Sequence, residues 1–284
     1  MTTRTATGPF SLINYGVGWD VGGTPANGDT FVVNTGTAIM VGGRFPSSTV
    51  DLGREFDTNT GTYLPNPNLV LFGNTDLGTI DVTTQTPDRS GAHLAVVGHA
   101  TVGAIVVHGS PGGTELTGTL APGSRLTTHF EGQPRTSINL TGGTLDNEGS
   151  SVVGAATISS NIHGHGSFEV LGFFGSMHIE GSVSAGQSFK LDGVSNLTVD
   201  HPADFHATVD ISDLVPITGD INLLGIHGDA WTYNNNLLSI TSGGSVVEKL
   251  RLTEGSHSFT VSNNTDGIVI NPSFGPQQGS GLVG

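Results

Sequence analysis

Three short segments follow one another in the second half of the chain: Ser167-Phe-Glu-Val-Leu-Gly172, Met177-His-Ile-Glu-Gly181 and Phe189-Lys-Leu-Asp-Gly193. In each segment apolar and polar residues alternate for a few positions, and a glycine follows. Alternation with a period of two is typical of a half-buried strand, and glycine accepts the backbone angles of a tight turn. The pattern therefore predicts strands of only a few residues, each closed by a turn.

The same pattern occurs earlier in the chain, as in Leu94-Ala-Val-Val-Gly98 and Ala104-Ile-Val-Val-His-Gly109. Successive runs begin roughly 8 to 12 residues apart, which is the spacing of an all-β protein. Two or three such runs would make one coil of about 20–30 residues, the repeat length of a solenoid. A β-sandwich is the alternative, but hairpin turns between long strands are scarce. We therefore expect an all-β fold, a parallel β-solenoid (β-helix) with almost no helix.

The pattern changes at two places along the chain. Residues 42–68 contain three prolines and few strand signals, which predicts an excursion from the solenoid. After about residue 213 the runs are longer, and Asn234-Asn-Asn236 and Ser242-Gly-Gly-Ser245 are good turn sequences. We expect a β-solenoid over 1–213, with an N-terminal cap and the excursion near 42–68, and a C-terminal antiparallel meander over 214–284 that caps it.

Composition restricts the classes of function. The net charge is −15, and such a surface repels nucleic acid and anionic membranes, so we expect no nucleic-acid partner. The chain has no cysteine, which excludes disulfides and thiolate chemistry. No apolar run approaches the roughly 18 residues of a membrane-spanning helix, so no membrane span is expected. Scarce lysine and abundant Thr, Ser, Asn and Gly favour an extracellular or cell-surface location, although no Sec signal is visible.

Two segments resemble a known group of proteins. The first runs from Trp19-Asp-Val-Gly-Gly-Thr-Pro through Asn27-Gly-Asp-Thr-Phe-Val-Val-Asn-Thr-Gly-Thr-Ala38, and the second from Ile221-Asn-Leu-Leu-Gly225 through Leu250-Arg-Leu252. They resemble the entry coil and the closing unit of bacterial extracellular β-helix proteins, which are repetitive, adhesin-like or autotransporter-passenger-like surface proteins of proteobacteria. The resemblance implies an exported surface or matrix protein and supplies no catalytic residues.

Acidic and histidine residues are candidates for chemistry. Asp192, Asp200 and Asp204 lie close together in sequence, and neighbouring carboxylates can divide the roles of a polysaccharide hydrolase or lyase. Few basic residues accompany them, so we favour a turn-ending role. Several histidines could line up on strands or form a pair, but their spacing assigns no complete ligand set, so we expect no metal site. These histidines are His99, His108, His129, His163, His165 and His178.

Aromatic and apolar residues suggest two kinds of contact. Trp231 and Tyr233 are candidates for stacking on a sugar ring if they are exposed, but we favour a place in an end cap, where coil ends need bulky covers. The N-terminal segment is apolar enough to add as a strand to a neighbouring subunit or to fold back over its own first coil. Its candidate self-assembly residues are Phe10, Leu12, Ile13, Tyr15 and Val17.

These observations favour a structural or interaction protein over an enzyme. We expect an exported structural or adhesive β-solenoid, a surface or biofilm-matrix component that assembles with itself end to end into fibres. The alternatives are a polysaccharide lyase or hydrolase and a carbohydrate-binding module. We expect no cofactor, apart from divalent cations that bridge the acidic surface, and an extracellular polysaccharide as the partner besides the protein itself.

Overall fold

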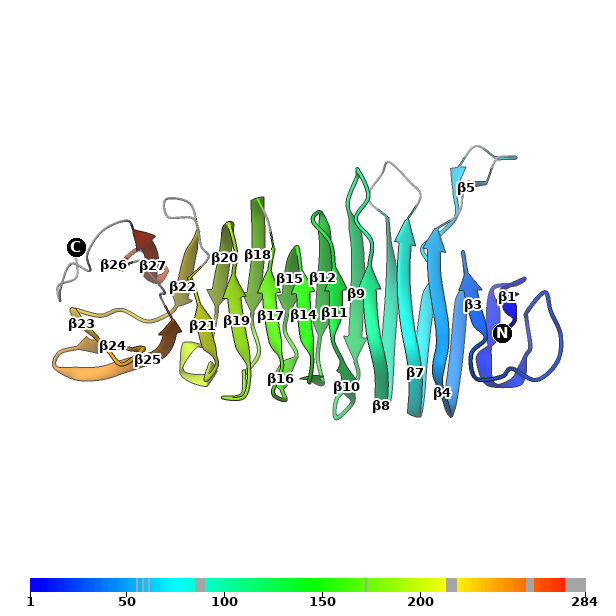
Figure 1. The fold of residues 1–284 in the computed structure, drawn as a ribbon, viewed down its shortest axis with the longest axis horizontal. Coiled ribbons are helices and arrows are strands. Elements are labelled where there is room, and N and C mark those ends of the chain that lie inside the picture. Colours follow the sequence, from blue (N-terminus) through cyan, green and yellow to red (C-terminus); the bar gives the residue numbers. More distant parts are fainter. Residues whose placement is uncertain are drawn as a thin grey trace.

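The computed structural model describes residues 1–54, 56–57, 59–60, 62–84, 90–171, 173–212, 219–253 and 258–273. These residues form strands and two short 3-10 turns, and none of them lies in an α-helix. The strands lie side by side across a long axis, with β1 and β3 toward one end and β23 to β25 toward the other (Figure 1). Within the described chain no helix is long and apolar enough to cross a membrane.

The first half contains the longest strands. The long strands are β4 (Thr37–Arg54), β7 (Asn68–Thr84) and β8 (Ser90–Val107). The other elements are the 3-10 turn η1 (Ile13–Tyr15) and the shorter strands β1 (Thr3–Thr5), β2 (Phe10–Leu12), β3 (Thr30–Val33), β5 (Phe56–Asp57), β6 (Thr62–Tyr63), β9 (Thr114–Leu120), β10 (Arg125–Thr128), β11 (Phe130–Gly132), β12 (Thr136–Thr141) and β13 (Thr144–Asn147).

The second half begins with short strands and ends with longer ones. They are β14 (Ser150–Val153), β15 (Ala155–Ile158), β16 (Asn161–His163), β17 (Ser167–Val170), β18 (Phe173–Ile179), β19 (Ser188–Leu191), β20 (Val194–Val199), η2 (Pro202–Asp204), β21 (Thr208–Asp210), β22 (Asp220–Leu224), β23 (Ala230–Asn234), β24 (Leu237–Ser242), β25 (Ser245–Thr253), β26 (Ser258–Asn263) and β27 (Gly267–Ser273).

Most strands pair in parallel with a strand one coil further along the chain. Leu69 of β7 lies opposite Leu94 of β8, and Ile138 of β12 lies opposite Ala156 of β15. Such a pairing needs a connection that returns the chain to the same edge, so the chain winds as a coil. The expectation of an all-β, largely parallel chain without α-helix is confirmed for the described residues.

Three faces make up each coil. Face A contains β2, the first part of β4, β7 and β8, and then β9, β12, β15, β18, β20 and β22. Face B contains the middle part of β4, β7 and β8 followed by β10, β13 and β16. Face C contains β1, β3, the last part of β4, β7 and β8, and then β11, β14, β17, β19 and β21.

Alternate residues of each face point into the coil and form one continuous core. Inside face C, Phe168 and Phe189 stack with ring centroids 5.2 Å apart. Phe205, which follows Val183 in the column of face B, packs its ring against Phe189 at 5.2 Å with a tilt of 41°. All three side chains are almost completely buried. The inner surface is therefore a packed column of side chains and leaves no channel along this part of the coil.

A ladder of buried amides crosses the coils at the corner between faces B and C. Asn147, which is fully buried, donates to Ser167 O at 3.1 Å and to Gln187 Oε1 at 3.0 Å. Its Oδ1 accepts the Ser151 hydroxyl at 2.9 Å. Gln187 in turn donates to the carbonyls of Asn147 and His163. These hydrogen bonds satisfy polar groups that the corner buries.

The excursion expected at 42–68 is shorter than predicted. Residues 42–54 belong to β4, which pairs with β7 up to Arg54 opposite Thr84. Pro46 lies where the register of that pairing shifts, between Phe45 and Thr49, and the ladder needs no N–H there. The chain leaves the large sheet only between Arg54 and Asn68, where β5 and β6 pair antiparallel.

Antiparallel pairs of strands enter the large sheet near its C-terminal end. β22 still pairs in parallel with β20, but its other neighbour β27 is antiparallel. β23 with β24, β24 with β25 and β26 with β27 are also antiparallel. β25 additionally pairs in parallel with β21 and so joins these strands to face C. The expected boundary at 213/214 lies outside the described residues.

Candidate functional site

Two outward columns of face A are apolar over its first coils. Leu12, Ile39, Val70 and Ala95 form one outward column through their registers. Val41, Phe72 and Val97 form the next column, with 45%, 50% and 37% of each residue exposed. Together with Phe10, which is exposed on β2, these residues are called the apolar face: Phe10, Leu12, Ile39, Val41, Val70, Phe72, Ala95 and Val97.

The column that contains Ala95 becomes polar from β9 onward. Ala95 lies opposite Thr119, which in turn lies opposite Thr141. In the later coils the column continues with Ser159, Glu180 and Asp200. The backbone N–H of each of these residues donates to a carbonyl on the strand one coil earlier, which keeps them in register. One column thus changes from hydrocarbon to hydroxyl and then to carboxylate groups along the axis.

The adjacent outward column that begins at Phe10 is polar in every later coil. Its members are Thr37, Asn68, His93, Thr117, Asn139, Thr157, His178, Thr198 and Asn222. An outward-facing strand position is normally polar in a solvated sheet. This column and the later coils follow that rule, so the hydrocarbon of the apolar face needs an explanation.

His178, Glu180 and Asp200 meet near the end of face A. His178 lies opposite Thr198 on the next strand, and the residues after β18 and β20 bring Glu180 and Asp200 beside it. Asp200 Oδ1 lies 2.6 Å from His178 Nε2, and Glu180 Oε1 lies 3.9 Å from His178 Nδ1. Ser159 on the preceding coil donates its hydroxyl to Glu180 Oε2. The three side chains are about one-third exposed, so the group is open to solvent.

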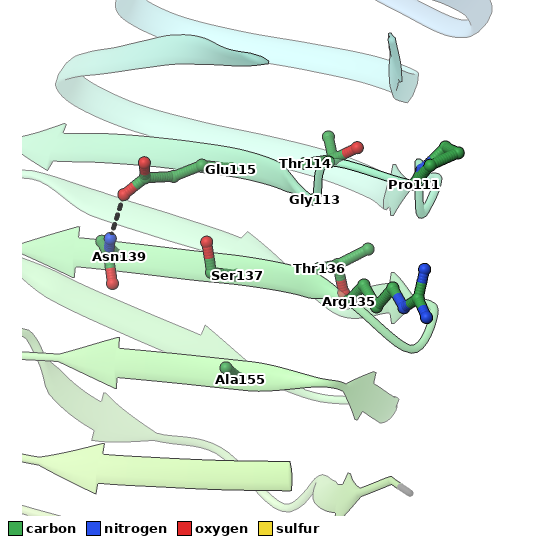
Figure 2. Close-up of a pocket in the computed structure, with 10 residues that line it drawn as sticks. Pro111, Gly113, Thr114, Glu115, Arg135, Thr136, Ser137, Asn139 and Ala155 are labelled. Carbon is green, nitrogen blue, oxygen red and sulfur yellow. Dashed lines mark hydrogen bonds between the residues drawn. The ribbon is translucent and has the colours of Figure 1, made fainter. Parts of the chain in front are cut away.

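A polar pocket of about 480 Å³ lies at the corner where face C leads into face A. Figure 2 shows Glu115 of β9 and Asn139 of β12 pointing toward each other at one end, and Arg135 and Pro111 at the turns of the other end. The Asn139 amide donates to the Glu115 carboxylate. Arg135, in the turn before β12, has a positive φ of 68°, which is uncommon for a residue other than glycine. The pocket offers a carboxylate, an amide, a hydroxyl and a guanidinium to a polar ligand.

A second ionisable group lies on the outside of face C. Asp51 and Asp81 are opposite each other on adjacent strands. His108 Nε2 lies 2.9 Å from Asp81 Oδ1, and the Thr83 hydroxyl donates to Asp51 Oδ1 at 2.9 Å. Burial raises the pKa of the Asp51 carboxyl; the bond from Thr83 opposes this rise, and the charge of Asp81 adds to it. The two aspartates are distant in sequence, so only the register reveals them as neighbours.

The three predicted aspartates do not form one site. Asp192 directly follows β19, Asp200 directly follows β20, and Asp204 lies in η2. Among the described residues, the one group of three metal-ligating side chains with ligand atoms within 4.8 Å of one another takes only Asp200 from this set. Its other members are His178, which the sequence singled out as a strand histidine, and Glu180, which it did not. His163 is exposed, and His165 lies 3.8 Å from Glu148.

The candidate sugar-stacking role of Trp231 and Tyr233 does not fit the burial of Trp231. Trp231 is only 4% exposed and packs 5.5 Å from Phe259. Tyr233 lies edge-on to the same ring at 5.0 Å, and its hydroxyl donates to Leu252 O at 2.8 Å. A ring that stacks on a sugar needs a free face, and these two rings instead hold β23 against its neighbours.

The N-terminal segment folds back over its own first coil. Leu12 N donates to Val17 O, and Ala6 bridges antiparallel to Trp19. Trp19 is buried against Phe31, with ring centroids 5.3 Å apart. This geometry corresponds to the second of the two arrangements expected for the segment.

The five candidate assembly residues therefore differ in availability. Ile13 is fully buried in the core and cannot contact a partner, so the prediction that it is an assembly residue is wrong. Leu12 is half-buried on face A, whereas Phe10, Tyr15 and Val17 are exposed by 67%, 65% and 57%. The apolar character of the segment suggested a contact surface, but its central residue packs inward.

Comparison with known proteins adds no relative: no family model matches the chain, and no match was found among the curated proteins or the solved structures.

Proposed function

We propose that the protein is an exported β-solenoid that serves as a structural or adhesive element of a surface or matrix, and that its C-terminal antiparallel strands cap the solenoid. The apolar face is the observation that carries this proposal. Two adjacent columns of apolar side chains, one half-buried and one exposed, suit contact with another extended surface, and an enzyme that acts in a pocket does not need them.

The occupant of the apolar face that we propose is a second copy of the chain. Four strands spaced by about 4.8 Å present roughly 200 Å² of apolar surface, and two such faces can pack about 10 Å apart as stacked sheets do. This area is well below the roughly 800 Å² per partner of a stable interface, so the association is weak and reversible. At a net charge of −15, added salt strengthens it by screening repulsion.

The proposal also includes end-to-end fibres, in which exposed apolar residues at one end of a chain contact those at the other end of the next chain. Tyr15 and Val17 are exposed near the N-terminal end, and Val246 and Val247 of β25 are exposed by 52% and 38% among the C-terminal strands. Figure 1 places the N-terminal coil and β25 toward opposite ends of the long axis. Contacts between two unlike ends repeat along a filament unless a ring closes.

The double substitution Phe72→Ser/Val97→Ser is expected to shift a concentration-dependent monomer–dimer equilibrium to monomer. Sedimentation velocity at low and high salt measures the equilibrium. Tyr15→Ser/Val17→Ser is the matched variant for the end contacts: it should leave side-by-side pairs intact and shorten any filaments seen by electron microscopy. If wild-type protein stays monomeric at every concentration and salt, self-association is rejected.

A second function is favoured by the Glu115–Asn139 pocket, namely binding of a polysaccharide chain through its hydroxyl groups. The carboxylate and amide present paired acceptors and donors, as sugar hydroxyls require. Asn139→Ala is expected to weaken binding of an oligosaccharide about tenfold, because one hydrogen bond is lost and Glu115 is left unpaired. Calorimetric titration with one neutral and one acidic oligosaccharide measures this, with the exposed Asn74→Ala as control. Equal binding by Asn139→Ala and wild type would exclude the pocket.

A further inference from the structure

We propose that His178, Glu180 and Asp200 bind one divalent cation of the zinc class at the outer corner of face A. The proposal does not depend on self-association. It rests on three observations: the donor atoms, the register that brings them together, and a hydroxyl that fixes one of the carboxylates.

The donor atoms are close enough for one ion. One ligand atom from each of the three side chains lies within 4.8 Å of the other two. Zinc bonds to histidine nitrogen at about 2.0–2.1 Å and to carboxylate oxygen at about 2.0–2.2 Å. Asp200 Oδ1 lies beside His178 Nε2 and Glu180 Oε1 lies beside Nδ1, and one ion binds only one of these nitrogens. Side-chain rotations, with the strands kept in place, must therefore bring one atom of each residue to a common centre.

The backbone holds the three residues in place without a ligand. The Cα atoms of Ile179 and Val199 are paired, which puts the following residues, Glu180 and Asp200, on neighbouring coils. His178 precedes Glu180 by two positions and so shares its outward face. The Glu180 N–H donates to Ile158 O at 3.0 Å, and the Asp200 N–H donates to Ile179 O at 2.9 Å. A site on hydrogen-bonded strands costs little ordering when an ion binds.

Ser159 acts as an outer-shell partner of the site. Its hydroxyl bonds to Glu180 Oε2, which leaves Oε1 directed toward His178 Nδ1 at 3.9 Å. Hydrogen bonds of this kind orient ligating carboxylates and are worth about 10- to 100-fold in metal affinity. Ser159 lies one coil before Glu180, and so three successive coils contribute to the site.

The chemistry of the donors selects the ion. Two carboxylates and a neutral imidazole offer two negative charges and one nitrogen, which suits Zn²⁺ and its first-row neighbours. Ca²⁺ and Mg²⁺ prefer sets of oxygen ligands only. Because the side chains are about one-third exposed, three protein ligands leave a coordination position that faces solvent. Such an open position accepts water or a donor atom from another molecule.

Calorimetric titration of tag-free, full-length protein with ZnCl₂ tests the site. The expected result is that one zinc ion binds tightly to each chain, that its affinity falls at least tenfold in His178→Gln and in Asp200→Asn, and that it falls about 10- to 100-fold in Ser159→Ala. The matched control is His165→Gln, which should still bind one zinc ion tightly. His165 is an exposed histidine beside Glu148, and among the described residues no third metal-ligating side chain joins them.

A second readout reports the ligands directly. Co²⁺ in place of Zn²⁺ should give visible absorption bands of a site with fewer than six ligands, and these bands should disappear in His178→Gln. Circular dichroism verifies that each variant is folded. The proposal is overturned if the wild-type protein does not bind one zinc ion tightly, or if His178→Gln and Asp200→Asn bind zinc as well as wild type. It is also overturned if Ca²⁺ competes as strongly as Zn²⁺.

Discussion

Replacing Phe189 by alanine is expected to destabilise the protein by about 3–5 kcal/mol. The ring is completely buried and lies between Phe168 and Phe205, each with its centroid 5.2 Å away. Its removal leaves a cavity that two neighbouring rings line, and the strands on both sides are fixed by parallel pairing, so the cavity cannot easily collapse. Chemical denaturation measures the loss, and hydrogen exchange locates it in the coils around β19.

The matched control is Phe72→Ala. Phe72 also lies in a strand of the parallel sheet, but it points outward and is 50% exposed. Its loss should change the unfolding free energy by about 0.5 kcal/mol or less, as for most surface substitutions. An equal effect of the two substitutions would contradict the assignment of inward and outward residues.

Substitution of Asp29 is expected to have the second-largest effect, about 3 kcal/mol for Asp29→Ala, because it leaves a buried arginine without its partner. The Asp29 carboxylate accepts Arg4 Nε at 3.0 Å, and it also accepts the backbone N–H groups of Thr2 and Ala26. Arg4 then donates to Val21 O at 2.8 Å and so holds the folded-back loop against the first coil. Asp20→Asn is the control, since Asp20 accepts two backbone N–H groups at the same end but is exposed.

The same carboxylate gives the folded state a dependence on acid pH. The hydrogen bond from Ala26 N–H, together with those from Arg4 and Thr2, lowers the pKa of Asp29 to about 2, although burial opposes the shift. A lowered pKa means that the folded state favours the ionised form. The stabilisation is therefore complete above the unfolded pKa of about 4 and is lost as the pH falls toward 2.

The difference in unfolding free energy between wild type and Asp29→Asn isolates this contribution. It should shrink as the pH is lowered from about 5 to 2. Asp51, whose pKa burial raises, acts in the opposite direction but is present in both proteins and cancels in the difference. A difference that stays constant over this range would show that Asp29 ionises equally in the folded and unfolded chains.

The local structure of this protein could be predicted from its sequence. Alternation at segments such as Ser167–Leu171 and a glycine after each run indicate short strands, because these signals depend only on neighbouring residues. The same patterns place Phe168 and Phe189 inward. Composition gives the charge of the surface and the absence of thiol chemistry. The expected excursion was too long because prolines suggested a loop where Pro46 occupies an irregularity in a continued strand.

Which residues meet on the outside of the coils depends on the tertiary structure. Coils differ in length, since the step along the chain from Ala38 to its partner Leu69 is clearly longer than the step from Ile138 to Ala156. No fixed period therefore predicts a neighbour, and a change of one residue in register would move a side chain to the other face.

For this reason the sequence did not predict the pairing of Asp51 with Asp81, the apolar face, or the contact of Asp200 with His178 and Glu180. These contacts depend on the register between coils. That register is set by the packing of the whole core, to which residues far apart in the chain contribute.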